Sequence, residues 1–90
     1  MKRSIKYVGL DVHQATTVSS VRDPSGRIIA RAILSTEPTA LVEHFRSMRG
    51  PIHVAFEEGT QAQWLHDLLV PLVDRVVVCD RRGEPRGNKN

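Results

Sequence analysis

Hydrophobic residues in the first third of the chain are spaced as in β-strands. Residues 5–12 (IKYVGLDV) are rich in β-formers and show no helical period, and residues 16–22 also favour extended structure after a short turn at 13–15. The segment Asp23-Pro24-Ser25-Gly26 predicts a tight turn, because proline fixes φ, glycine permits positive φ and aspartate can hydrogen-bond the turn backbone. Residues 27–33 return as a third strand, so we expect an antiparallel meander.

The pattern then changes to that of a helix. Residues 36–38 (TEP) supply start signals, and Gly50-Pro51 predicts the end of the helix. Between them, four apolar residues follow the spacing of one helical face, namely Leu41, Val42, Phe45 and Met48.

A strand–helix–strand unit completes the chain. Residues 52–56 (IHVAF) form a short apolar run of strand length, and Thr60–Gln63 fits a capping box that would start a second helix. Pro71 is expected to kink or end this helix, and residues 75–79 (RVVVC) predict a last strand buried on both faces. The buried stripe of the helix is expected to consist of Leu65, Leu68, Leu69 and Leu72.

These elements predict an α/β domain of order β-β-β-α-β-α-β over residues 1–80, followed by a flexible basic tail at 81–90. Because strand–helix–strand crossovers are right-handed, the first, fourth and fifth strands are expected to be parallel neighbours. The meander would extend one edge of this mixed sheet, and helices would cover its faces. The covering is expected to depend also on helices beyond Asn90, without which an apolar patch is exposed.

Length and composition restrict the class of protein. Ninety residues make one small domain, and 40% hydrophobic with 26% charged residues argues against wholesale disorder. No apolar run approaches the roughly 20 residues that span a bilayer, and the basic start lacks the apolar stretch of a signal peptide. The single Cys79 cannot form an internal disulfide, which fits a cytoplasmic protein without a membrane partner.

Positive charge gathers at the carboxyl end. The formal net charge is +3, which mildly favours an anionic partner such as nucleic acid. A solvated tail is the alternative interpretation of this charge. The candidate phosphate contacts are Arg81, Arg82, Arg86 and Lys89.

Two acidic residues follow strands that we expect to be parallel neighbours. Asp11 lies near the end of the first strand and Glu57 at the end of the fourth, so both carboxylates would emerge at one edge of the sheet. Converging carboxylates repel each other unless a cation or a proton lies between them, and Mg²⁺ is held by such groups. The alternatives are solvated acids or helix caps. Glu58 fits an exposed position before the second helix, and Asp80 fits a turn.

Four short segments carry a resemblance to a known family. Residues 7–13 (YVGLDVH), 54–60 (VAFEEGT) and 75–80 (RVVVCD), together with 87–89 (GNK), resemble in order the corresponding parts of DEDD transposases. These insertion-sequence recombinases carry a RuvC-like nuclease domain with an RNase H-like fold. The resemblance covers essentially the whole chain. It implies DNA transposition and recombination through Mg²⁺- or Mn²⁺-dependent phosphodiester chemistry.

The resemblance also implies roles for individual residues. Asp11 matches the first metal-binding, catalytic acid of the family and Glu57 the second, with Glu58 as the alternative if the alignment shifts by one. The third and fourth acids of the family follow a Gly-Asn-Lys stretch, and the ninety residues end before them. The expectation is therefore an amino-terminal fragment, inactive by itself. Family members bind DNA, some use a structured guide RNA, and the full-length protein is expected to be oligomeric.

Other functions are weaker alternatives. The second hypothesis is a truncated, non-catalytic nucleic-acid-binding domain. An actin-like ATPase would need a glycine-rich turn between the first two strands, which residues 13–15 (HQA) do not provide. The four histidines have no metal-ligand spacing, although His13 follows Asp11 closely enough to face the site, and Trp64 fits a packing surface.

Overall fold

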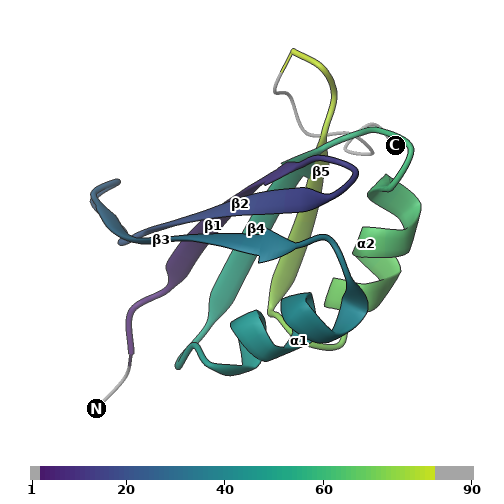
Figure 1. The fold of residues 1–90 in the computed structure, drawn as a ribbon. Coiled ribbons are helices and arrows are strands. Elements are labelled where there is room, and N and C mark those ends of the chain that lie inside the picture. The colour runs from purple at the N-terminus through teal and green to yellow at the C-terminus, as the bar shows by residue number, and fades with distance from the viewer. Residues whose placement is uncertain (1–2, 83–90) are drawn as a thin grey trace.

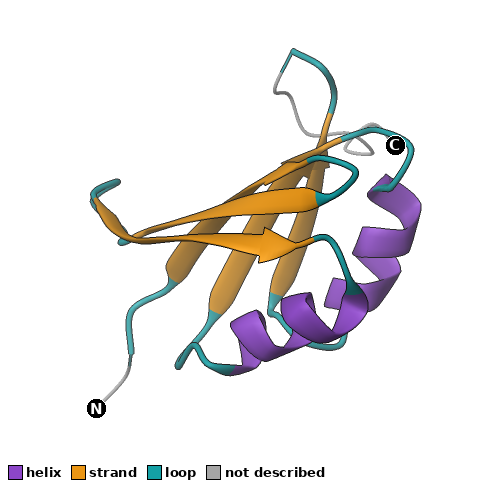
Figure 2. Cartoon of the chain, viewed as in Figure 1, coloured by secondary structure: helices purple, strands orange, loops and turns teal. Residues whose placement is uncertain are grey.

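The strands and helices follow one another along the chain in the predicted order (Figures 1 and 2). The computed structural model describes residues 3–82. The strands and helices within this range are β1 (Lys6–Val12), β2 (Thr16–Arg22), β3 (Ile28–Ser35), α1 (Pro38–Arg46), β4 (Ile52–Glu57), α2 (Ala62–Leu69) and β5 (Arg75–Cys79).

The strands form one five-stranded mixed sheet in the order β3-β2-β1-β4-β5. β2 is antiparallel to both β1 and β3, so the first three strands form the predicted meander. β1, β4 and β5 are parallel neighbours, as the two strand–helix–strand connections indicated. The chain is therefore a small α/β domain whose parallel strands end together at one edge.

Both helices lie on the same face of the sheet (Figure 2). α1 connects β3 to β4 and α2 connects β4 to β5, so both connections move across the sheet in the same direction. Right-handed crossovers that move in the same direction place their helices on the same side. The expectation that helices cover both faces is therefore wrong for residues 3–82.

The core lies between the two helices and this face. Alternate residues of the central strands point into it, since successive side chains of a strand project to opposite faces. Burying a leucine or phenylalanine side chain is worth about 1.5–3 kcal/mol, so these contacts dominate the stability of the fold. The buried hydrophobic residues are Val8, Leu10, Val21, Leu41, Phe45, Ile52, Val54, Phe56, Leu65 and Leu69.

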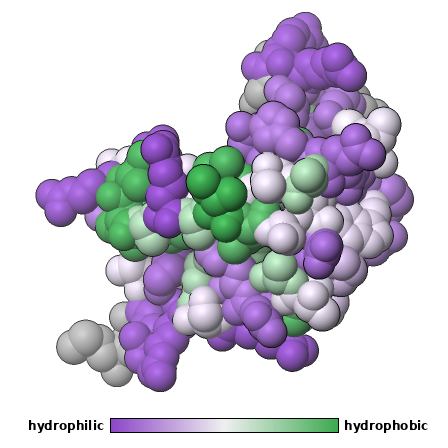
Figure 3. All heavy atoms as spheres, viewed as in Figure 1, coloured by the Kyte–Doolittle hydropathy of each residue, from purple (hydrophilic) through white to green (hydrophobic). Residues whose placement is uncertain are grey.

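The opposite face of the sheet is open over residues 3–82. Figure 3 shows hydrophobic surface gathered over the β2–β3 part of the molecule, where Ile33 is 75% exposed. The valine run of β5 predicts burial on both faces, but the three valines are only half-buried. The reason is the place of β5 at the edge of the sheet, with α2 against one of its faces only.

The helix termini differ from the prediction in two places. α1 ends at Arg46 with Ser47 as its C-cap, so Met48 packs against the core from the following turn instead of from the helix. The capping box predicted at Thr60–Gln63 does not form. Gln61 is the N-cap of α2 without a side-chain hydrogen bond, and Gln63 instead donates to Asp67 one helical turn later. The predicted stop at Pro71 is confirmed, because α2 ends at Leu69.

The predicted turn at residues 23–26 is confirmed in detail. The Asp23 carboxylate accepts hydrogen bonds from the hydroxyl and the backbone N–H of Ser25 and from the backbone N–H of Arg27. Gly26 has a φ of +93°, which glycine adopts without strain. The Ser25 hydroxyl and the Arg27 N–H hold the pKa of Asp23 below its usual value, because they stabilise the carboxylate.

A polar pair lies beneath α1. The fully buried Ser19 hydroxyl is 2.8 Å from Nε2 of His44, and burial holds the pKa of His44 below its ordinary value of 6.5. The unfolded chain therefore binds a proton at a higher pH than the folded chain does.

We expect the free energy of unfolding to be constant above about pH 7.5 and to fall as the pH drops through 6.5 toward the lower pKa of folded His44. Urea unfolding between pH 7.5 and 5 measures this slope. His44→Gln should flatten it, because glutamine does not titrate, whereas the matched His66→Gln should leave it in place. An unchanged slope in His44→Gln would show that another group is responsible.

Candidate functional site

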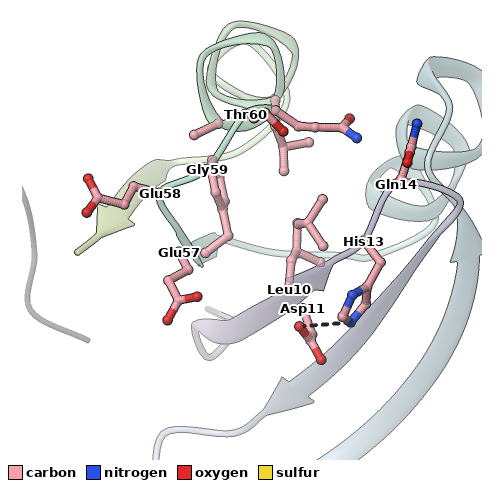
Figure 4. Close-up of a pocket in the computed structure, with 13 residues that line it drawn as sticks. Leu10, Asp11, His13, Gln14, Glu57, Glu58, Gly59 and Thr60 are labelled. Carbon is pink, nitrogen blue, oxygen red and sulfur yellow. Dashed lines mark ion pairs between the residues drawn. The ribbon is translucent and has the colours of Figure 1, made fainter. Parts of the chain in front are cut away.

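Asp11 and Glu57 occupy equivalent positions on the two central parallel strands. Leu10 of β1 pairs with Phe56 of β4, and both are buried under the helices. Asp11 and Glu57 are the next residues, so their side chains project from the opposite, open face at the carboxyl ends of the strands. Figure 4 shows the two carboxylates directed to the same side. The structure therefore brings the two predicted acids together at one edge.

Glu58 takes a different direction. Its side chain points away from Asp11 in Figure 4, and its backbone N–H donates to the carbonyl of Cys79 at 2.7 Å. This bond continues the pairing of β4 with β5 by one residue. Of the two adjacent glutamates, Glu57 is the one on the side of Asp11.

His13 lies beside Asp11. Its Nε2 is 3.3 Å from Oδ1 of Asp11, with the two side chains 63% and 73% exposed. A contact this exposed contributes little to stability, so its significance lies in where it holds the imidazole. The sequence suggested that His13 could face the site, and the structure places its imidazole against Asp11.

The turn that carries His13 is held from two directions. The His13 N–H donates to the carbonyl of Thr16, which closes the turn between β1 and β2. The Thr36 hydroxyl donates to the carbonyl of His13 at 2.8 Å and lies 2.8 Å from the hydroxyl of the fully buried Thr17. Because the Thr36 proton is committed to His13, Thr17 is the donor in the second bond. The site turn is thus fastened to the start of α1.

The acids line a concave region between the β1–β2 turn and the start of α2. It encloses about 400 Å³, and Asp11, His13, Glu57, Glu58 and Thr60 are among its lining residues. Carboxylate oxygens are hard ligands of the kind that Mg²⁺ and Mn²⁺ prefer. Over residues 3–82, however, no three His, Cys, Asp or Glu side chains gather as a set that could hold a metal ion. Of the three carboxylates that line this region, only Asp11 and Glu57 are directed to the same side.

The basic tail is described only in part. Arg82 turns back onto Asp80, with its backbone N–H 2.9 Å from Oδ1 and its guanidinium 3.3 Å from Oδ2. Asp80 thus has the turn position that the sequence favoured for it. Arg81 is exposed next to the start of α2, and Arg86 and Lys89 lie outside the described residues.

Sequence reasoning missed a set of cations on the open face. Arg22, Arg31 and Arg75 are exposed and occupy strand positions that alternate with residues directed at the helix face. The alternation of hydrophobic and polar residues in β2 was a usable signal for Arg22. The common location of all three required the strand register, which the sequence alone did not supply.

The comparisons with known proteins add no family assignment. No protein-family model matches the sequence, and no curated protein is similar enough to it to be a relative. Among the residues that the structure describes, no helix is both long and apolar enough to cross a membrane.

Proposed function

We propose that this chain is the amino-terminal part of the nuclease domain of a DEDD-type transposase, with an RNase H-like, RuvC-like fold. Its function would be DNA transposition and recombination through metal-dependent cleavage and transfer of DNA strands. The observation that supports this proposal is the position of Asp11 and Glu57 on one face, at the carboxyl ends of adjacent parallel strands. Ligands of open α/β sheets bind beyond this end of the strands.

The donor set fits a hard divalent cation. Mg²⁺ is commonly bound by one or two carboxylates, with water and substrate phosphate in the remaining positions, and Mn²⁺ accepts the same ligands. A pair of such ions would supply activation of the nucleophile and stabilisation of the leaving oxygen in phosphodiester cleavage. Asp11 and Glu57 would hold such an ion, and His13 would restrain the Asp11 carboxylate. With two carboxylate ligands, we propose weak metal affinity and no cleavage by the ninety residues alone.

The same small ligand set favours a second candidate, a truncated and non-catalytic nucleic-acid-binding domain. In both cases DNA is the proposed partner, and a cytoplasmic setting is proposed. A structured guide RNA and further subunits are proposed only for the full-length transposase. The two candidates differ in whether Asp11 and Glu57 bind a cation, and this difference can be measured on the ninety-residue chain.

The test uses Mn²⁺, whose unpaired electrons broaden nearby NMR signals. In the ¹⁵N-labelled chain we expect Mn²⁺ to broaden the amide signals of residues 11–13 and 57–59 first. Asp11→Asn with Glu57→Gln should require at least about tenfold more Mn²⁺ for the same broadening, because carboxylates supply the protein's oxygen ligands. Glu43→Gln with Asp67→Asn removes two exposed carboxylates on the helices and serves as the matched control. Equal broadening in the acid variant and the control would contradict the metal site and favour the non-catalytic candidate.

A further inference from the structure

A row of cationic and aromatic side chains crosses the open face of the sheet. In the register of the four strands β2, β1, β4 and β5, Arg22 pairs with Tyr7, Tyr7 with His53, and His53 with Arg75. Since neighbouring strands are about 4.8 Å apart, the backbones of the two arginines are roughly 14 Å apart. These four residues form the Arg22–Arg75 row.

The positive charge of this face has no acidic partner among residues 3–82. In the described residues, the basic side chains that lie within salt-bridge distance of a carboxylate are His13, His66 and Arg82. Arg22 donates to the carbonyl of Gly26, and Arg31 of the neighbouring strand donates to the Ser20 hydroxyl at 3.4 Å. Both of these acceptors are neutral. The guanidinium charges are therefore available to an anionic ligand.

The aromatic members of the row are held against each other. The Tyr7 and His53 rings meet edge to face, with centroids 5.5 Å apart and planes at 90°. Tyr7 remains 40% exposed in spite of this contact. An exposed ring between two arginines is the combination on which single-stranded nucleic acids bind, because bases stack on the ring while phosphates meet the cations.

A path of small residues joins the row to the acids. The next register row contains Ser20, Gly9 and Ala55, and a Cβ added to Gly9 would meet no atom within 4 Å. The small side chains of these residues therefore leave a depression in the surface of the open face. A groove of about 510 Å³ covers this part of the face, and its lining includes Arg22, Arg31, Gly9, Ala55, Asp11 and Glu57. A chain seated on the row can lie in this groove and extend to the carboxylates.

We infer that the open face binds single-stranded DNA, with the arginines of the Arg22–Arg75 row on phosphates and Tyr7 stacked on a base. The groove over Gly9 leads the strand toward Asp11 and Glu57. This path and the choice of DNA over RNA are the parts of the inference that rest on the proposed function. The binding itself requires no metal, because the row lies away from the carboxylates. A duplex fits less well, since its bases are not free to stack on Tyr7.

The experiment is fluorescence anisotropy with a labelled oligothymidine and the ninety-residue chain in EDTA, at several salt concentrations. Arg22→Gln with Arg75→Gln should weaken binding roughly tenfold and lower the salt slope by about 0.7 for each phosphate that an arginine no longer neutralises. Tyr7→Leu should weaken binding about fivefold or more, and Tyr7→Phe should retain it. Thermal melts of each variant show whether the fold persists.

Two matched controls remove the same charge elsewhere. Arg46→Gln with Arg49→Gln changes two exposed arginines at the end of α1 and after it, and Arg81→Gln with Arg82→Gln changes the tail. Both are expected to weaken binding less than the row variant does. Equal losses in all three pairs would overturn the inference, because binding would then follow net charge alone.

Two further comparisons use other oligonucleotides and a variant without the two acids. Tighter binding of a duplex, or of the matching uridine oligonucleotide, would overturn the assignment to single-stranded DNA. Asp11→Asn with Glu57→Gln should bind the oligothymidine in EDTA at least as well as the natural chain, since two negative charges near the groove are removed. Loss of binding in that variant would contradict the inference. The Mn²⁺ test of the proposed function is independent, because it contains no DNA.

Discussion

Replacing Phe45 by alanine is expected to lower the free energy of unfolding of the ninety-residue chain by about 3–5 kcal/mol, a large part of its total stability. Phe45 is only 2% exposed and lies in α1 among the core residues contributed by the sheet and by α2. Truncating a buried phenylalanine to alanine costs about 3–5 kcal/mol, because transfer free energy is lost and a cavity remains. A domain of this size has roughly 5–13 kcal/mol of stability in total, at about 0.05–0.15 kcal/mol per residue.

The measurement is urea unfolding followed by far-UV circular dichroism. Phe45→Leu is the control that keeps an apolar side chain in place, and it should lose clearly less stability than Phe45→Ala. A second control, Val42→Ala, changes a half-buried residue of the same helix. Near-equal unfolding midpoints for Phe45→Ala and the natural chain would contradict the view that the α1–sheet contact is the main source of stability.

The meander and the strand order were predictable because their signals are local. A threonine- and valine-rich strand, the Asp23–Gly26 turn and a following strand leave few arrangements other than an antiparallel pair of hairpins. The parallel arrangement of β1, β4 and β5 followed from the handedness of crossovers. Hence the juxtaposition of Asp11 with Glu57 was accessible from sequence, since it depends only on strand order and on counting residues to the strand ends.

Details that depend on competition between alternative contacts were not predictable in this way. Met48 has the helical spacing of α1, yet the helix ends at Arg46 and the side chain reaches the core from a turn. Gln63 fits a capping box, yet its amide finds Asp67 at the next turn of the helix. In both cases the local pattern is compatible with more than one arrangement and does not select between them.

The position of both helices on one face has a consequence for the site. β1 directs Val8 and Leu10 into the core and Tyr7, Gly9 and Asp11 to the open face. The core side therefore holds β1 and β4 in register, while the open side displays the row and the acids along the same strands. Crossover handedness, applied to both helices together, already implies this one-sided arrangement. If helices covered both faces, the strand positions of the Arg22–Arg75 row would be buried. The expectation of two covered faces therefore gave no reason to look for a cationic surface there.

The second large effect concerns the hydroxyl pair that fastens the site turn. Thr36→Val removes both the acceptor of the Thr17 hydroxyl and the donor to the carbonyl of His13. Because Thr17 is fully buried, its hydroxyl is left without a partner, which costs about 1–3 kcal/mol. We expect the free energy of unfolding to fall by this amount. For a domain of this size, each kcal/mol lost lowers Tm by roughly 4–8 °C.

A double-mutant cycle separates this cost from a general effect of valine at position 36. In Thr17→Val with Thr36→Val the buried hydroxyl is absent, so part of the lost stability should return, and Thr36→Ser should stay close to the natural chain. Additive losses in the double variant would show that the two hydroxyls are not coupled. The His13 carbonyl lacks its donor in both Thr36→Val proteins, so the amide signals of residues 12–14 should shift in both. In the double variant the free energy of unfolding would thus recover in part while the hydrogen bond to the His13 carbonyl stays absent. The two readouts therefore separate the stability of the core from the contact that holds the turn with His13 beside Asp11.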